Sequence, residues 1–156
     1  MAISARLASY LEAQGVDYTL VPHPHTESSM ATAAAARVPG DRLAKAVIVG
    51  DDQGWMMVVV PSDYHVHLGA LHRHLGRTLG LATEPEAVGL FPDCDEGAIP
   101  PIGPAFDLRT LIDERLLSVP EVFFESGDHE HLVRVSGDQF RTLLAEAEPI
   151  DVGQHV

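Results

Sequence analysis

Apolar positions near the start of the chain recur with the spacing of a helix. The side chains that share this face are Ile3, Leu7, Tyr10 and Leu11. They predict an amphipathic helix over residues 3–14, which Gly15 ends. A second, alanine-rich helix is expected to begin near Thr26, Ser28 or Ser29, whose hydroxyls are good N-caps, and to end before Pro39.

Short apolar runs in the middle of the chain predict buried strands, because they are bounded by turn residues. Two of them, residues 45–49 and 55–60, flank Asp51-Asp52-Gln53-Gly54 and predict a hairpin. The other elements expected are strands over 17–21, 105–112, 121–126 and 131–135, an extended segment over 77–82, and helices over 69–75, 84–90 and 137–146. Helices at both ends, with mostly β structure between them and no strict alternation, predict an α+β protein with a mixed sheet.

The size and composition of the chain agree with one globular domain over residues 1–156. The chain has 156 residues, of which 46% are hydrophobic, enough for a core without a disulfide or a metal. Its single cysteine, Cys94, cannot form an internal disulfide, as is typical of a reducing compartment. No apolar run approaches the roughly 20 residues of a membrane span, and no signal-peptide pattern is present. A cytoplasmic location without membrane association is therefore expected.

Charge is distributed unevenly along this acidic chain. Ten Lys and Arg residues against 23 Asp and Glu give a net charge of −13, which argues against extensive binding along nucleic acid. Residues 28–50 and 64–83 nevertheless carry +2 each, and the remainder carries −17. A local cationic face on an acidic body suits a small anionic ligand or one end of a nucleic acid. Chance clustering on a solvated surface, or adaptation to salt, is the alternative.

Lys45 is the only lysine, since the other nine cations are arginines. A compact ammonium can contact a phosphate or an ester oxygen as a point charge, and its pKa responds to burial. This makes Lys45 a candidate for a role that arginine cannot serve. A solvated lysine at a strand edge is the alternative.

Other candidate chemistry in the chain is weaker. Four His-x-His pairs occur: His23/His25, His65/His67, His72/His74 and His129/His131. On a strand such a pair could bind a metal, but none has a third ligand at short range, so no metal site is predicted. Cys94 lies between Asp93 and Asp95, whose carboxylates would raise its pKa and disfavour a nucleophilic thiol.

An irregular segment over residues 92–104 is rich in proline and glycine, at a length where loops tend to be functional. Its part from Gly97 to Gly103 is stiffened by two prolines and two glycines. A stiff loop can hold backbone N–H groups toward a ligand without an ordering cost at each binding event.

Four segments, in this order, resemble the YbaK-like aminoacyl-tRNA deacylases, which include the editing domain inserted in bacterial prolyl-tRNA synthetases. The segments are Tyr18-Thr-Leu-Val-Pro-His-Pro-His25, Val38-Pro-Gly-Asp-Arg-Leu-Ala-Lys45, Gly97-Ala-Ile-Pro-Pro-Ile-Gly103 and Phe124-Glu-Ser-Gly-Asp-His129. The similarity runs over about residues 5–145 and leaves 147–156 as a tail. It implies a mixed, partly barrel-like sheet with flanking helices, and ester hydrolysis without a metal or other cofactor.

The resemblance also implies which residues form the site. Lys45 matches the family's essential lysine, and His129 matches the histidine of a Gly-x-His turn. The catalytic residues it implies are Lys45, Gly97, Ala98, Ile99, Pro101 and Gly103, from the lysine motif and the Gly-x-x-x-Pro loop. The expected substrate-binding residues are Pro100, Gly127, His129, Arg37, Arg42, Arg73 and Arg77. Pro100 stands where relatives often carry Ser or Thr, so a hydroxyl is missing here.

The function that the resemblance implies is trans-editing, the removal of a wrong amino acid from a tRNA, with a tRNA(Pro) as the leading substrate. The expected partner is the acceptor end of the tRNA, and a synthetase is a further candidate. Loop N–H groups would stabilise the oxyanion, and Lys45 would hold the terminal phosphate or the ester. Two alternatives remain: a non-catalytic module of the same fold that binds aminoacyl-adenosine or a synthetase, and a histidine-based metalloprotein.

Overall fold

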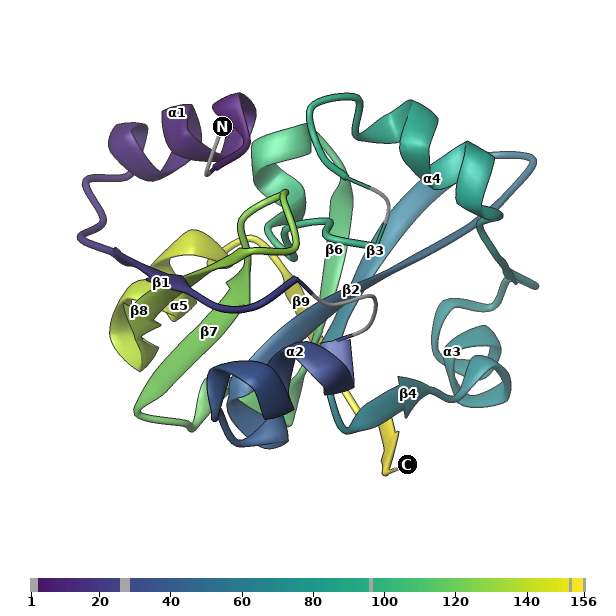
Figure 1. Ribbon diagram of the computed structural model, residues 1–156. Helices are drawn as coiled ribbons and strands as arrows, with labels where there is room; N and C mark the ends of the chain where they lie inside the picture. The colour runs from purple at the N-terminus through teal and green to yellow at the C-terminus, as the bar shows by residue number, and fades with distance from the viewer. Residues whose placement is uncertain (1–2, 26–28, 96, 152, 156) are drawn as a thin grey trace.

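The computed structural model describes residues 3–25, 29–95, 97–151 and 153–155. Its centre is an eight-stranded mixed sheet in the order β1-β8-β7-β2-β3-β6-β9, with β5 paired to the outer part of β2 (Figure 1). These strands are β1 (Thr19–Pro22), β2 (Leu43–Asp51), β3 (Gly54–Pro61), β5 (Gly80–Leu81), β6 (Arg109–Asp113), β7 (Glu121–Glu125), β8 (His131–Ser136) and β9 (Glu148–Ile150). A separate two-stranded sheet joins β4 (Tyr64–Val66) to β10 (Gly153–His155).

The large sheet combines antiparallel and parallel strand pairs. β2 and β3 form the predicted antiparallel hairpin, whereas β2 pairs with β7 in parallel and β3 pairs with β6 in parallel. The parallel contact between β2 and β7 is short, with Leu43 opposite Phe123 and Ala44 opposite Phe124. This arrangement confirms the predicted α+β class with a mixed sheet.

Within the described residues, five helices flank the sheet: α1 (Ala5–Ala13), α2 (Ser29–Ala36), α3 (Leu68–Leu75), α4 (Glu84–Leu90) and α5 (Gly137–Leu143). Short 3₁₀ turns occur at η1 (Gly40–Arg42), η2 (Gly103–Phe106) and η3 (Glu114–Leu117). Local sequence fixes the helix ends: Ser4 caps α1, and Thr83 and Ser136 open capping boxes on α4 and α5. The expected caps Thr26 and Ser28 lie outside the described residues.

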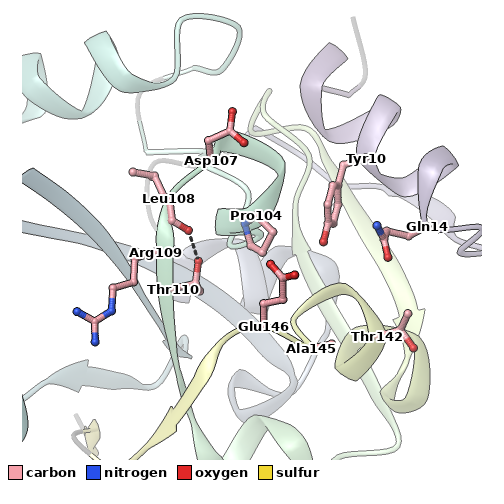
Figure 2. Close-up of a pocket in the computed structure, with 10 residues that line it drawn as sticks. All are labelled: Tyr10, Gln14, Pro104, Asp107, Leu108, Arg109, Thr110, Thr142, Ala145 and Glu146. Carbon is pink, nitrogen blue, oxygen red and sulfur yellow. Dashed lines mark hydrogen bonds between the residues drawn. The ribbon is translucent and has the colours of Figure 1, made fainter.

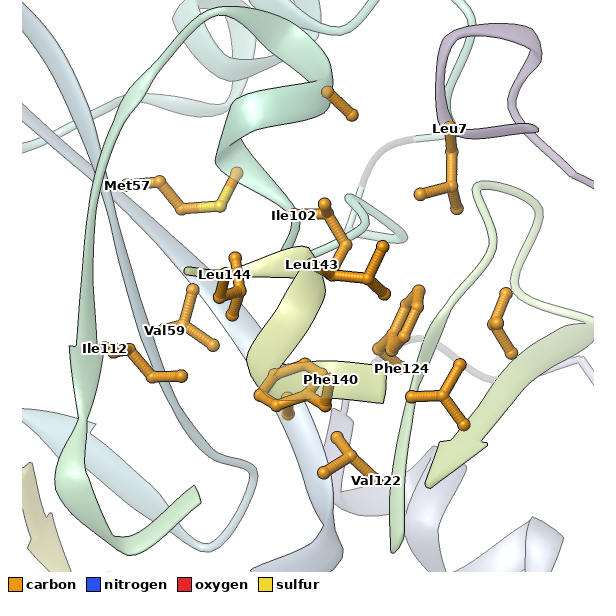
Figure 3. Packing of buried hydrophobic residues seen from close by; sticks show 14 of the residues in the cluster. Leu7, Met57, Val59, Ile102, Ile112, Val122, Phe124, Phe140, Leu143 and Leu144 are labelled. Atoms are coloured by element: carbon orange, nitrogen blue, oxygen red, sulfur yellow. The ribbon is translucent and has the colours of Figure 1, made fainter. Parts of the chain in front are cut away.

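The two faces of the sheet bury different clusters. On β2, Ala44 and Ile48 face a large apolar core that α1 and α5 complete, shown in Figure 3 around Phe124 and Phe140. Alternation along the strand places Leu43 and Val49 on the opposite face. That face is covered by α2, through Ala33, and by α3, through Leu71. The sheet is therefore a two-sided scaffold with one continuous core and one divided core.

Three sequence predictions need correction. The strand expected over 105–112 is the 3₁₀ turn η2 followed by β6, because Pro104 favours the first turn of a helix and Asp107 ends it in a left-handed conformation. The strand β4 was not predicted. Residues 148–150, expected to belong to a tail, form β9 against β6, and 153–155 form β10. These strands are each three residues long and carry too little periodicity to be recognised.

Among the described residues, no helix is long and apolar enough to cross a bilayer.

Candidate functional site

Lys45 lies half-buried on the face of β2 that α2 and α3 cover. It pairs across the hairpin with Val60, and its Nζ donates a hydrogen bond of 3.4 Å to the backbone oxygen of Ser62. Burial lowers the pKa of Lys45, and the carboxylate of Asp63 opposes that shift. The sequence therefore places its only lysine where its charge is partly withdrawn from water.

A buried carboxylate lies one strand away from Lys45. The parallel pairing of β2 with β7 ends at Ala44 and Phe124. The next residue on β2 is Lys45, and the next on β7 is Glu125. Glu125 is only 5% exposed, and its Oε1 accepts a hydrogen bond of 3.0 Å from the hydroxyl of Thr32 on α2. Both side chains belong to the same face of the sheet, because each follows an apolar residue of that face by two positions.

Two histidines, His23 and His129, lie close enough to Glu125 to influence its pKa. Burial raises the pKa of Glu125, while the hydrogen bond from Thr32 and the charges of His23 and His129 lower it. His23 and His129 are both buried, and the ring of His129 lies 5.2 Å from that of His25 at an angle of 60°. The predicted residue His129 thus stands beside Glu125, in a cluster that sequence reasoning did not foresee.

The turn that follows β7 has an unusual backbone. Gly127 adopts φ +123° and His129 adopts φ +62°. A side chain at Gly127 would be conformationally strained, and its Cβ would lie 3.4 Å from Ser4 Cβ and 3.5 Å from Cys94 Sγ. Asp128 stabilises the turn by accepting hydrogen bonds from the backbone N–H groups of residues 130 and 131. The predicted Gly-x-His segment is therefore a tight, well-connected turn.

The Gly-x-x-x-Pro loop is attached to this turn. The backbone N–H of Asp95 donates a hydrogen bond of 2.7 Å to the backbone oxygen of Gly127. Gly97 then adopts φ +79° and is exposed, whereas Ala98, Pro100 and Pro101 are buried and Ile99 is half-buried. The turn after Glu125 is thus hydrogen-bonded to Asp95, just before the loop, and β7, which leads into this turn, pairs with β2 directly before Lys45.

Gly103 has a packing role of its own. A Cβ at this position would lie 1.7 Å from the Oγ1 of Thr110, so any other residue would have to displace the Thr110 side chain. Gly103 opens the turn η2, and the neighbouring Ile102 belongs to the large core. The end of the loop is thereby fixed to the scaffold.

The four arginines assigned to substrate binding have different surroundings. Arg77 is held by Asp51 through contacts of 2.6 and 2.9 Å. Asp51 is six residues along β2 from Lys45, about 20 Å at the rise of a strand, so the structure does not bring Arg77 to Lys45. Arg42 forms an ion pair of 3.5 Å with Glu121.

Arg37 and Arg73 are exposed, Arg37 just after α2 and Arg73 on α3. The cationic character expected for residues 28–50 and 64–83 is therefore reduced, because Asp51, Asp63 and Glu121 lie beside three of their five cations.

The sequence offered two further candidates, a nucleophilic Cys94 and a metal site. Burial, followed by the charge of Asp93, raises the pKa of Cys94 to about 12, as its two acidic neighbours suggested. Within the described ranges, no group of three or more His, Cys, Asp or Glu side chains could hold a metal ion.

The residues that sequence reasoning missed are Glu125, His23 and Thr32. A clear signal existed for Glu125: a lone carboxylate within the apolar run Val122-Phe-Phe-Glu-Ser126 is unusual in a buried strand. Thr32 lies within an alanine-rich helix and His23 beside a proline, and nothing in those contexts indicates a shared site.

A surface cavity of about 530 Å³ lies on the other face of the sheet, where α1, η2, β6 and α5 meet (Figure 2). Tyr10, Thr110 and Glu146 are among its lining residues, and the Tyr10 hydroxyl donates a hydrogen bond of 3.1 Å to the backbone oxygen of Leu143. None of the predicted site residues lines this cavity. It is therefore separate from the Lys45–Glu125 cluster.

The fold and the assembled motifs define the class of protein: the chain belongs to the family of aminoacyl-tRNA editing domains, whose family model matches residues 23–143. That range contains Lys45, the Gly97–Gly103 loop and His129, so the resemblance drawn from the sequence is confirmed.

Solved structures show the same fold over nearly the whole chain. A protein provisionally described as a trans-editing enzyme for prolyl-tRNA synthetase is 26% identical, with 97% of this chain and 96% of that chain covered and a TM-score of 0.82. The hypothetical protein APE2540 is 24% identical, with 96% and 99% covered and a TM-score of 0.83. No curated protein matches the chain.

Proposed function

We propose that this protein hydrolyses, in trans, the ester that joins a wrong amino acid to the 3′-terminal adenosine of a tRNA. The observation that carries the proposal is the position of Lys45 in an aminoacyl-tRNA editing domain. Its side chain is half-buried on the same face as Glu125, and the turn after Glu125 is hydrogen-bonded to Asp95, just before the Gly97–Pro101 loop. A partly desolvated cation interacts strongly with a developing negative charge.

The reaction needs no covalent nucleophile, because an aminoacyl ester is already activated toward water. Attack by water places negative charge on the carbonyl oxygen, and backbone N–H groups of the stiff loop are the proposed donors to it. Such a donor contributes roughly 2.7–4 kcal/mol in comparable sites. Lys45 would hold the ester or the terminal phosphate. The Cys94 thiol stays protonated, in keeping with a mechanism that does not use it.

The proposed substrate is a tRNA(Pro) that carries alanine, serine or cysteine, and the proposed partner is the synthetase that releases it. Because the proposed substrate is a tRNA, we expect the enzyme to act in the cytoplasm. Only the acceptor end needs to enter the site, which agrees with a protein whose net charge is −13. The exposed Arg37 and Arg73 are the cations best placed to meet phosphates beyond the ester.

Release of amino acid from a panel of prolyl-, alanyl-, seryl- and cysteinyl-tRNA(Pro) tests this proposal. We expect the wild type to cleave at least one mischarged tRNA faster than prolyl-tRNA(Pro), and Lys45→Ala to lose about 10²- to 10³-fold in rate. Arg109→Ala is the matched control, because it removes an exposed cation that is ion-paired with Glu148 at the far edge of the sheet.

Three outcomes would contradict the proposal. If no ester is cleaved faster by the wild type than by Lys45→Ala, the protein is not a deacylase of this kind. Tight binding of aminoacyl-tRNA without turnover would favour the non-catalytic module instead. Loss of activity with a chelator would favour the metalloprotein.

A further inference from the structure

Two buried polar atoms in the cluster around Glu125 have no hydrogen-bond partner among the described residues. They are Oε2 of Glu125 and Nε2 of His23. The two side chains are only 5% and 8% exposed, and they lie close enough for His23 to influence Glu125 electrostatically. Buried polar atoms in folded proteins are nearly always paired, so two unpaired atoms in one cluster indicate a place that a ligand completes.

The chemistry of these atoms selects the kind of ligand. The Nδ1 of His23 lies 2.7 Å from the backbone oxygen of Pro24, which can only accept, so Nδ1 carries the proton. In the neutral ring Nε2 is then an acceptor, as is Oε2 of Glu125. A ligand that pairs with both must donate at least two hydrogen bonds. A primary ammonium does so and also carries the opposite charge to the carboxylate, whereas a phosphate or carboxylate would be repelled.

The position of the two atoms fits one group of the proposed substrate. Glu125 and Lys45 follow the paired residues Phe124 and Ala44 on neighbouring strands and share one face of the sheet. In an aminoacyl ester, the α-ammonium is two bonds from the carbonyl carbon. An ester held at Lys45 therefore carries its ammonium into the neighbourhood of Glu125.

We propose that Glu125, assisted by His23, binds the α-ammonium group of the aminoacyl ester and so determines that only esters with a free amine are cleaved. This inference rests on the proposed function. Burial raises the pKa of the Glu125 carboxyl, and an ammonium is the partner that restores its charged form. Esters whose nitrogen is acylated, such as peptidyl esters, offer a single N–H and no charge, so they would leave at least one acceptor unpaired and be rejected.

The experiment compares an aminoacyl-tRNA with its α-hydroxyacyl counterpart, made by deamination with nitrous acid. The ester is the one that the wild type cleaves fastest in the tRNA(Pro) panel. Each rate is divided by the uncatalysed rate of the same ester, which removes the difference in intrinsic reactivity. We expect the wild type to accelerate the aminoacyl ester about 10- to 100-fold more than the hydroxyacyl ester.

Substitutions at Glu125 then show which residue carries the preference. Glu125→Gln should lose most of it by slowing the aminoacyl ester alone, and Glu125→Asp, which keeps the charge, should retain part of it. Glu148→Gln is the matched control, because it neutralises a half-exposed carboxylate on β9 and should keep the full preference.

The outcomes separate this inference from the proposed function. If the wild type cleaves neither ester, the proposed function fails. If it accelerates both esters equally, or if Glu125→Gln keeps the preference of the wild type, the deacylase remains and the role of Glu125 is overturned. The wild-type comparison decides the matter even if a Glu125 variant does not fold.

Discussion

Two strands of the large sheet end in a buried carboxylate on the same face, and the two carboxylates have different surroundings. β6 ends at Asp113, which is fully buried and accepts hydrogen bonds of 2.9 to 3.0 Å from the backbone and the guanidinium of Arg115. The guanidinium also stacks on Tyr64 at 4.7 Å. β7 ends at Glu125, which has one hydrogen bond, from Thr32, and one oxygen without a partner among the described residues.

The difference separates a scaffold residue, Asp113, from the proposed site residue Glu125. Both oxygens of Asp113 are satisfied within the chain, and its Oδ2 lies so close to Gly153 that a Cβ there would approach it to 2.3 Å. Nothing further can reach it. Burial of the Glu125 carboxyl group costs free energy, and the single hydrogen bond from Thr32 offsets only part of that cost. Proteins tolerate such a cost mainly where function requires it. Burial alone therefore does not distinguish the two carboxylates, whereas hydrogen bonding does.

The largest effect expected from this comparison is on stability at Asp113. Asp113→Asn replaces an acceptor oxygen with a donor that faces the Arg115 guanidinium, and should lower the unfolding free energy by about 2–3 kcal/mol. Denaturation with urea, followed by circular dichroism, measures the change. Asp107→Asn is the control, because its side chain is 93% exposed and should change stability by less than about 0.5 kcal/mol. Equal losses in the two variants would show that Asp113 is not a structural anchor.

A smaller effect is expected at Glu125. Because burial raises its pKa, the folded state binds a proton more tightly than the unfolded chain. Stability from this group is therefore present below the ordinary value of 4.5 and is lost as the pH rises through the folded pKa. Glu125→Gln should remove this loss and stay within about 1 kcal/mol of the wild type at pH 7.

Melting curves of wild type and Glu125→Gln from pH 4.5 upward provide the measurement. His23, His129 and Asp128 surround Glu125 and are present in both proteins, so the difference between the curves reports Glu125 and its coupling to them. If the variant instead loses stability steeply at every pH, Glu125 is a scaffold residue like Asp113, and the contrast between the two strands disappears.

The sequence predicts those elements of the fold whose periodic pattern is long, and it misses the very short ones. The amphipathic helix at the start, the hairpin of β2 and β3 and the α+β class were predictable, because long periodic segments and turn residues specify them. The short strands β4, β9 and β10 depend on distant pairing partners and carry no local signal.

The candidate site divides in the same way. Lys45 and the Gly97–Gly103 loop were predictable from a unique residue and a resemblance. The cluster of Glu125, His23 and Thr32 was not, because its members come from three distant segments that only the sheet register and α2 bring together.

The smallest effect is expected at Cys94, which contacts the same turn as Glu125 without sharing its chemistry. Its Sγ would lie 3.5 Å from a Cβ at Gly127, and burial raises its pKa to about 12, so at pH 8 only about one thiol in 10⁴ is ionised. Iodoacetamide should therefore modify the folded protein far more slowly than the same chain in urea, and mass spectrometry assigns the product to the only cysteine. Cys94→Ala should cleave the panel of esters at the wild-type rate. Rapid alkylation of the folded protein, or lost activity in a folded Cys94→Ala variant, would place a reactive thiol in the site. The comparison of Asp113 with Glu125 would then leave out one of the reactive groups.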